Sequence, residues 1–336
     1  MHKTCRSSRP QDIVTEDELD MQKMVKTNVG EIAVNVSGSG PVILCVHGWP
    51  EHSWSWRHQA EYFSGKGYTV AAMDVRGYGD SAKPKEIAAY TLKQLASDVA
   101  AVADALSEDP VILFGHDWGA PITYTTALIY PEKIRAVAGM SVPYTPGGEV
   151  GLLDIMRAVY ADRFFYMLYF QEEGVVEAEV SADPKAALRK IYYSISGDAP
   201  EGAFGKDKSP DSGLLDGLID PDPLPSWLSN DDLQVSVDAL DKGGYHGPFN
   251  RYRALDLDHQ ELADYRGKTL DMPTCFIGGA RDPVRSFVPG VDAFAAAGMA
   301  CTDFRGTTII PDVGHWVQQE APAETNEALE RFLAGL

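Results

Sequence analysis

The segment Val111-Ile112-Leu113-Phe114-Gly115-His116-Asp117-Trp118-Gly119 decides the fold of this chain. It begins with a continuous apolar run, which is typical of a strand buried on both faces of a parallel sheet. The pattern Gly-x-Asp-x-Gly follows at once, and residues 120–128 then read as a helix. A strand, a sharp turn and a helix in this order predict a nucleophile elbow, with Asp117 at its tip.

The same rhythm extends to both sides of this segment. Comparable apolar runs lie at residues 42–46, 68–75, 134–142, 274–278 and 307–311. Between the second and the elbow, apolar residues from Leu92 to Leu106 recur at spacings of three and four, which marks an amphipathic helix. A final helix is expected after Pro322. Strands alternating with helices predict an α/β fold, namely a mostly parallel central sheet with helices on both faces.

The rhythm stops in the middle of the chain. Residues 144–250 contain no comparable strand runs and read as helices at 152–171 and 184–196, followed by a connection at 197–225 rich in Gly, Pro and Asp. We therefore expect an inserted helical cap. The predicted organisation is a core of residues 25–143 and 253–336, a cap of residues 144–252 and an N-terminal extension of residues 1–24.

Composition excludes several classes of protein. The chain has 336 residues and a net charge of −20, which argues against nucleic acid or an anionic membrane surface as a partner. Its four cysteines lack paired spacing, so neither a disulfide framework nor a zinc site is expected. No segment has the length of a signal peptide or a membrane span, which predicts a cytoplasmic protein. No motif for a nucleotide, cofactor or metal is present.

An aspartate at the elbow changes the chemistry from that of esterases, which would have Ser at position 117. A carboxylate is already an anion at neutral pH. It can therefore displace a leaving group directly from a saturated carbon, which would leave an alkyl ester on Asp117. Water must break that ester to regenerate the protein.

Two further residues are candidates for the hydrolysis of such an ester. Asp282 and His315 follow later strand runs, and the chain order of nucleophile, acid and histidine is that of α/β-hydrolases. His315 would activate water, and Asp282 would orient the imidazole. An ordinary turn residue is the alternative for Asp282, because Arg-Asp-Pro suits a turn. His47 and His116 are interpreted as structural.

The oxyanion that forms on the ester needs preplaced donors. The backbone N–H of Trp118 follows the nucleophile directly, and that of Trp49 lies in the loop after the neighbouring strand. We expect these two groups to form the oxyanion hole.

The chain resembles the epoxide hydrolases of the α/β-hydrolase fold over residues 25–335. The core motifs are His47-Gly48-Trp49-Pro50-Glu51, Asp74-Val75-Arg76-Gly77-Tyr78-Gly79-Asp80-Ser81, Gly115-His116-Asp117-Trp118-Gly119 and Gly314-His315-Trp316. The cap motifs are Tyr166-Met167-Leu168-Tyr169-Phe170-Gln171-Glu172 and Gly247-Pro248-Phe249-Asn250-Arg251-Tyr252-Arg253. This resemblance implies cofactor-free conversion of an epoxide and water into a vicinal diol, with Tyr166 and Tyr252 bound to the epoxide oxygen. Arg251 departs from the pattern, because an aromatic residue is common there.

Two phenols also suit the chemistry, because they stay protonated at neutral pH and can protonate the departing oxygen. The aromatic cap favours an apolar epoxide. One alternative is a haloalkane dehalogenase with the same Asp117, His315 and Asp282, in which Trp118 and Trp49 would hold the halide. A second is a catalytically inactive small-molecule receptor. A homo-oligomer remains an open possibility.

Overall fold

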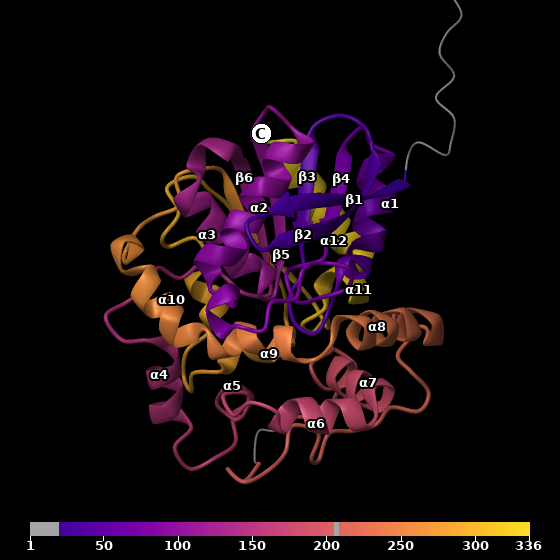
Figure 1. Cartoon of the computed structure of the whole chain (residues 1–336), viewed down its shortest axis with the longest axis vertical. Helices are drawn as coiled ribbons and strands as arrows, with labels where there is room; N and C mark the ends of the chain where they lie inside the picture. Colours follow the sequence, from indigo (N-terminus) through magenta and orange to yellow (C-terminus); the bar gives the residue numbers. More distant parts are fainter. Residues whose placement is uncertain (1–19, 205–207) are drawn as a thin grey trace, which may run out of the picture.

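The computed structural model describes residues 20–204 and 208–336. Eight strands form one sheet in the order β1-β2-β4-β3-β5-β6-β7-β8 (Figure 1). Their bounds are β1 Asp20–Thr27, β2 Gly30–Gly38, β3 Val42–Val46, β4 Thr69–Met73, β5 Val111–His116, β6 Ile134–Met140, β7 Thr274–Gly279 and β8 Phe304–Ile310. The six strands from β4 to β8 in this order pair in parallel, and β1 and β2 join them in antiparallel fashion. The predicted α/β-hydrolase fold is confirmed.

The strand β1 corrects one expected boundary. It begins at Asp20, so the last five residues of the expected extension 1–24 belong to the sheet. They pair with β2 in the register that places Met24 opposite Ala33. Met24 remains 43% exposed, and within residues 21–27 only Val25 is buried. A sparsely buried edge strand has no continuous apolar run, which is why no strand was expected here. Residues 1–19 lie outside the described part.

Helices cover both faces of the sheet, as predicted. Alternate residues of β3 show this directly, because successive side chains of a strand point to opposite faces. One apolar cluster contains Val42, Leu44 and Val46 together with side chains of α2 (Leu92–Leu106) and α3 (Gly119–Ile129). Ile43 and Cys45 pack in another cluster with α1 (Arg57–Ser64) and α12 (Pro322–Leu333). The helix expected at 92–106 is therefore found at its predicted position.

The described part of residues 144–252 consists of helices and loops, which gather at one end of the sheet (Figure 1). These helices are α4 Leu152–Val159, α5 Tyr166–Tyr169, α6 Val175–Ala182, α7 Pro184–Ser194, α8 Asn230–Gly243 and α9 His246–Arg253. The prediction of a single helix at 152–171 is wrong, because residues 160–165 are not helical and separate α4 from α5. The aromatic rings in this segment pack in several directions. The expected limit between cap and core at residue 252 falls inside α9.

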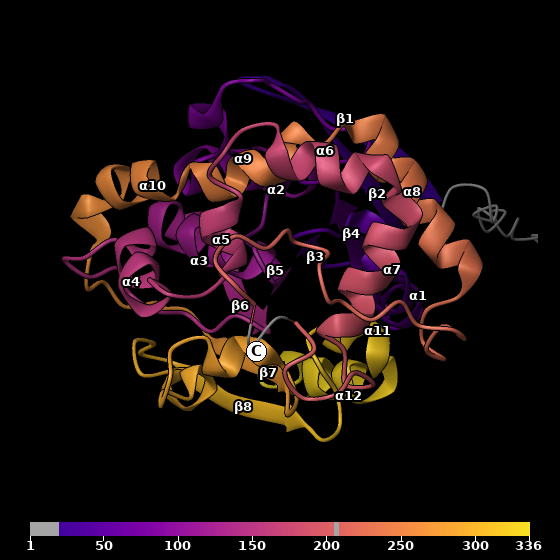
Figure 2. The same ribbon diagram turned by 90° about the horizontal axis from the view of Figure 1, so that it is seen from below.

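The remaining α-helices of the described residues are α10 Leu255–Glu261 and α11 Val317–Glu320. Seen from the cap side, α5, α7 and α9 surround the ends of β3 and β5 (Figure 2). Within residues 20–204 and 208–336, no helix combines the length and the apolar character required to cross a membrane.

Candidate active site

The turn after β5 holds Asp117 in a left-handed conformation, with φ of 50°. Such a conformation is costly for a residue with a side chain, and here the surrounding backbone enforces it. A Cβ atom at Gly119 would lie 1.9 Å from the carbonyl oxygen of Val46, and one at Gly115 would lie 2.5 Å from that of Gly119. Both positions therefore require glycine, which is the physical basis of the Gly-x-Asp-x-Gly pattern.

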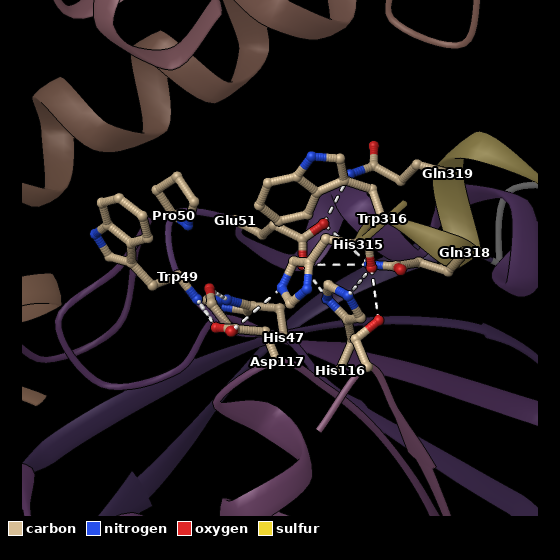
Figure 3. A network of polar contacts seen from close by, with 12 residues as sticks. His47, Trp49, Pro50, Glu51, His116, Asp117, His315, Trp316, Gln318 and Gln319 are labelled. Carbon is tan, nitrogen blue, oxygen red and sulfur yellow. Dashed lines mark hydrogen bonds and ion pairs between the residues drawn. The ribbon is translucent and has the colours of Figure 1, made fainter. Parts of the chain in front are cut away.

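The loop after β3 approaches the elbow just as closely. The backbone N–H of Trp49 donates to Oδ1 of Asp117 at 2.7 Å (Figure 3). The His47 ring braces this loop, since Nε2 accepts the N–H of Val75 at 2.9 Å and Nδ1 lies 2.9 Å from the carbonyl oxygen of Gly48. These contacts agree with the structural role that the sequence suggested for His47.

The Gly48→Ala substitution is expected to lower activity by about 10²-fold, the cost of losing an oxyanion donor. The new Cβ would lie 2.2 Å from Oδ1 of Asp117 and 2.6 Å from the nitrogen of Trp118, so it would displace the Trp49 loop from the carboxylate. Steady-state turnover and thermal unfolding measure the effect. Gly148→Ala is the matched control, because no atom lies within 4 Å of its added Cβ. Equal activity of the two variants would contradict the proposed donor role of this loop.

The structure brings together the three residues that the sequence placed far apart. Nε2 of His315 lies 3.3 Å from Oδ2 of Asp117, and Nδ1 of His315 lies 3.0 Å from Oδ2 of Asp282. The other oxygen of Asp282 accepts the backbone N–H of Val284 at 2.9 Å. Asp282 is thus both the turn residue of the alternative interpretation and the partner of the imidazole.

The charges of this group stabilise one another. Burial alone would lower the pKa of His315, but the carboxylates of Asp282 and Asp117 together raise it well above its ordinary value. Burial would raise the pKa of Asp117, whereas the His315 contact and the backbone N–H of Trp118 lower it. His315 thus lies between the carboxyl groups of Asp117 and Asp282, and this position favours the protonated form of its ring.

A buried network fixes the backbone of His315 (Figure 3). Its carbonyl oxygen accepts from Nε2 of His116 at 2.8 Å and from the hydroxyl of Ser141 at 2.6 Å. Its N–H donates to the carbonyl oxygen of Ile195 in the cap at 2.9 Å. Nδ1 of His116 lies 2.7 Å from Oε2 of Glu51. His116 is thus a support for His315, in agreement with its structural interpretation.

Sequence reasoning missed Glu320, which clamps the loop that carries His315. Its carboxylate accepts the N–H groups of Gly314 and Trp316 at 2.9 Å each, and that of Gly197 in the cap at 2.7 Å. Burial raises its pKa. The only signal in the sequence is an acidic residue five positions after His315, which is too common to stand out.

Tyr166 and Tyr252 come from different cap helices, α5 and α9, and their rings lie 5.7 Å apart at 78°. Both rings also pack on the indole of Trp49, at 6.4 Å and 6.0 Å. Burial is the main cause of a strong rise in the pKa of both hydroxyls, and the Asp117 carboxylate adds to it. Both phenols are therefore protonated at neutral pH and lie near Asp117.

Arg251, which departs from the family pattern, is buried beside Tyr252. Its guanidinium lies 4.7 Å from the centre of the Trp118 ring. The Trp118 ring in turn meets Tyr252 edge to face at 5.3 Å, and a hydrogen-bonding contact from the Trp118 side chain opposes the rise in the Tyr252 pKa. Tyr252 thus keeps its place beside Tyr166 although its neighbour in the sequence is unusual.

Known proteins share both the sequence and the fold. The family model described as the alpha/beta hydrolase fold matches residues 41–189. Epoxide hydrolase A of Mycobacterium tuberculosis is 35% identical over 318 residues, which cover 94% of this chain and 98% of that protein. Epoxide hydrolase 2 of Siraitia grosvenorii is 32% identical, with 93% and 99% covered. The solved structure of an epoxide hydrolase from an endophytic Streptomyces has a TM-score of 0.89 at 38% identity, with 94% and 96% covered.

The fold and the arrangement around Asp117 define an enzyme of the α/β-hydrolase class. Similarity over nearly the full length of these relatives adds the narrower assignment: the chain belongs to the epoxide hydrolases of this fold. The resemblance stated from the motifs is confirmed.

Proposed function

We propose that this protein converts an apolar epoxide and water into a vicinal diol through an ester on Asp117. One observation carries the proposal. Oδ1 of Asp117 accepts the N–H of Trp49, Oδ2 faces His315, and two protonated phenols lie close by. A nucleophile, a base and acids for the leaving oxygen thus converge within one site.

In the first step, an oxygen of Asp117 forms a bond to one epoxide carbon while the bond from that carbon to the ring oxygen breaks. Tyr166 and Tyr252 hold the ring oxygen, and one of them transfers its proton to it. An alkoxide is a poor leaving group, so this protonation lowers the barrier. Trp49, Phe170 and Phe249 supply an apolar aromatic wall around the tyrosines.

In the second step, His315 removes a proton from water, and the resulting hydroxide attacks the carboxyl carbon of Asp117. The N–H groups of Trp49 and Trp118 hold the oxyanion. The bond between the carboxyl carbon and the diol oxygen then breaks, the second proton of the water passes to the diol oxygen, and the Asp117 carboxylate is regenerated. Esterification has by then neutralised one of the two carboxylates that raise the pKa of His315. The imidazolium therefore loses part of its stabilisation once the ester forms, which lets His315 act as a base at that stage.

The rival functions are weaker on the same geometry. A haloalkane dehalogenase would need indole N–H donors for halide, whereas the Trp118 ring packs edge to face on Tyr252 and against the Arg251 guanidinium. A halide leaving group also requires no proton, so the two phenols near Asp117 would have no catalytic role in a dehalogenase. An inactive receptor would not require His315 to be held between Asp117 and Asp282.

A substrate panel tests the proposal. Purified protein is expected to form diol from styrene oxide and related apolar epoxides, and to release no halide from chloroalkanes of similar size. Asp117→Ala is the blank for both assays. Halide release without diol would assign the dehalogenase instead, and neither product from a broad panel would favour the receptor.

The pH dependence of ester hydrolysis tests the role of Asp282. His315 must be neutral to accept a proton, so hydrolysis slows as the pH falls below its pKa. The Asp282 carboxylate raises that pKa. Asp282→Asn is therefore expected to shift the acid limb to lower pH and to lower the plateau rate by up to about 10⁴-fold. Decay of the ester in single turnovers at several pH values measures both, and an unmoved limb would remove Asp282 from this role.

A further inference from the structure

Arg251 is a charged group that the reaction described above does not use. The residue is only 3% exposed, and it lies next to Tyr252 in the sequence and on the face of the Trp118 ring. A cation held over an indole is attracted to the electrons of the ring and draws them toward itself. The N–H at the ring edge then becomes a stronger hydrogen-bond donor.

The contacts of Arg251 hold its charge in place without fully neutralising it. Nη1 donates to the carbonyl oxygen of Tyr90, and Nη2 pairs with Asp258. Asp258 also accepts the backbone N–H of Leu92 at 2.6 Å, at the start of α2, so its charge is shared. Among residues 20–204 and 208–336, no acceptor meets the buried Nε of Arg251. Burial lowers the pKa of Arg251 to about 9, which still leaves it charged at neutral pH.

The Trp118 ring connects Arg251 to Tyr252. Arg251 stacks on Trp118, whose ring meets the Tyr252 ring edge to face at 5.3 Å, and the Trp118 side chain opposes the rise in the Tyr252 pKa. Within residues 20–204 and 208–336, the ring contacts of Tyr166 are Trp49, Tyr252 and four phenylalanines, and none of them is a cation. The two phenols are thus electrostatically unequal.

We propose that Arg251 is a positioning residue for epoxide opening, which acts through Trp118 to stabilise the phenolate that Tyr252 becomes when it gives up its proton. The inference rests on the proposed function and deepens it. As Asp117 bonds to the epoxide carbon and the ring opens, the proton of Tyr252 goes to the epoxide oxygen. Tyr166 keeps its proton and donates only a hydrogen bond. The phenolate later regains the proton that His315 takes from water.

A purely mechanical role is the competing explanation, because Arg251 and Asp258 also fasten α9 and α10 to residues 90–92 of the core. The two explanations predict opposite changes in the rate of ester formation for Asp258→Asn, and Arg251→Met provides the comparison. Arg251→Met removes both the charge and the anchor. Asp258→Asn weakens the anchor but leaves the guanidinium less neutralised, so an electrostatic role predicts that phenolate formation becomes easier.

The experiment measures the rate of ester formation by rapid quenching and mass spectrometry, in full-length protein with styrene oxide. Arg251→Met is expected to slow ester formation about tenfold and to leave ester hydrolysis unchanged. Its alkaline limb should move to higher pH, because Tyr252 loses the stabilisation of its ionised form. In Asp258→Asn, ester formation should stay equal or become faster, and the alkaline limb should move to lower pH.

A Tyr252→Phe background separates the explanations once more. If Arg251 acts through the Tyr252 proton, Arg251→Met should add no further loss in that background. The proposal is overturned if the loss persists there, or if Arg251→Met and Asp258→Asn slow ester formation in parallel with their loss of thermal stability. Should Arg251→Met fail to fold, the direction of the Asp258→Asn shift decides. Absence of an ester in the wild-type protein would instead overturn the proposed function.

Discussion

Asp117→Ala is expected to abolish diol formation, with a loss of at least about 10⁴-fold, comparable to removal of a nucleophile in other hydrolases. The reason is that Asp117 is the proposed nucleophile, and alanine offers no group that can bond to the substrate carbon. Initial rates with an apolar epoxide measure the loss. Asp109→Ala is a suitable control, because Asp109 is exposed and distant from the elbow.

Two measurements can detect the proposed ester on Asp117 directly. In His315→Gln the ester should still form but should persist, so the peptide that contains Asp117 should carry the mass of the epoxide. In a single turnover of the wild-type protein in heavy-oxygen water, the label should enter Asp117 and not the diol. Label in the first diol, or an unmodified peptide during turnover, would contradict direct attack by Asp117.

The double variant Tyr166→Phe with Tyr252→Phe is expected to fold but to form the ester about 10³-fold more slowly, the usual scale of general acid catalysis. Phenylalanine preserves the aromatic packing against Trp49 and removes only the two acidic protons. Rapid quenching of ester formation and thermal unfolding together measure this outcome.

A matched pair of tyrosines controls for the loss of hydroxyl groups from the cap. Tyr169 donates to Glu179 at 2.8 Å, and Tyr245 donates to Asp241, so both hydroxyls are already engaged elsewhere. Tyr169→Phe with Tyr245→Phe should retain most of the rate of ester formation. Equal losses in the two double variants would show that Tyr166 and Tyr252 have no special role in protonation.

Much of this protein could be predicted from local patterns. The apolar runs and the glycine-bounded turn at Asp117 predicted the sheet, because a parallel strand must be buried on both faces and only glycine fits the close approaches at Gly115 and Gly119. The order of Asp117, Asp282 and His315 predicted which loops would meet, since the carboxyl ends of parallel strands lie along one edge.

Other features depend on contacts between segments distant in the sequence, which leave no periodic signal. β1 is an edge strand whose exposed residues resemble an extension. The helix expected at 152–171 is interrupted between α4 and α5, where the packing of aromatic rings and not the spacing of apolar residues determines the path of the chain. The clamp of Glu320 on Gly197 joins residues 123 positions apart. Only the tertiary structure reveals that Arg251 lies on the face of Trp118. The position of a buried charge depends on partners that are distant in the chain and not on its own neighbours in the sequence.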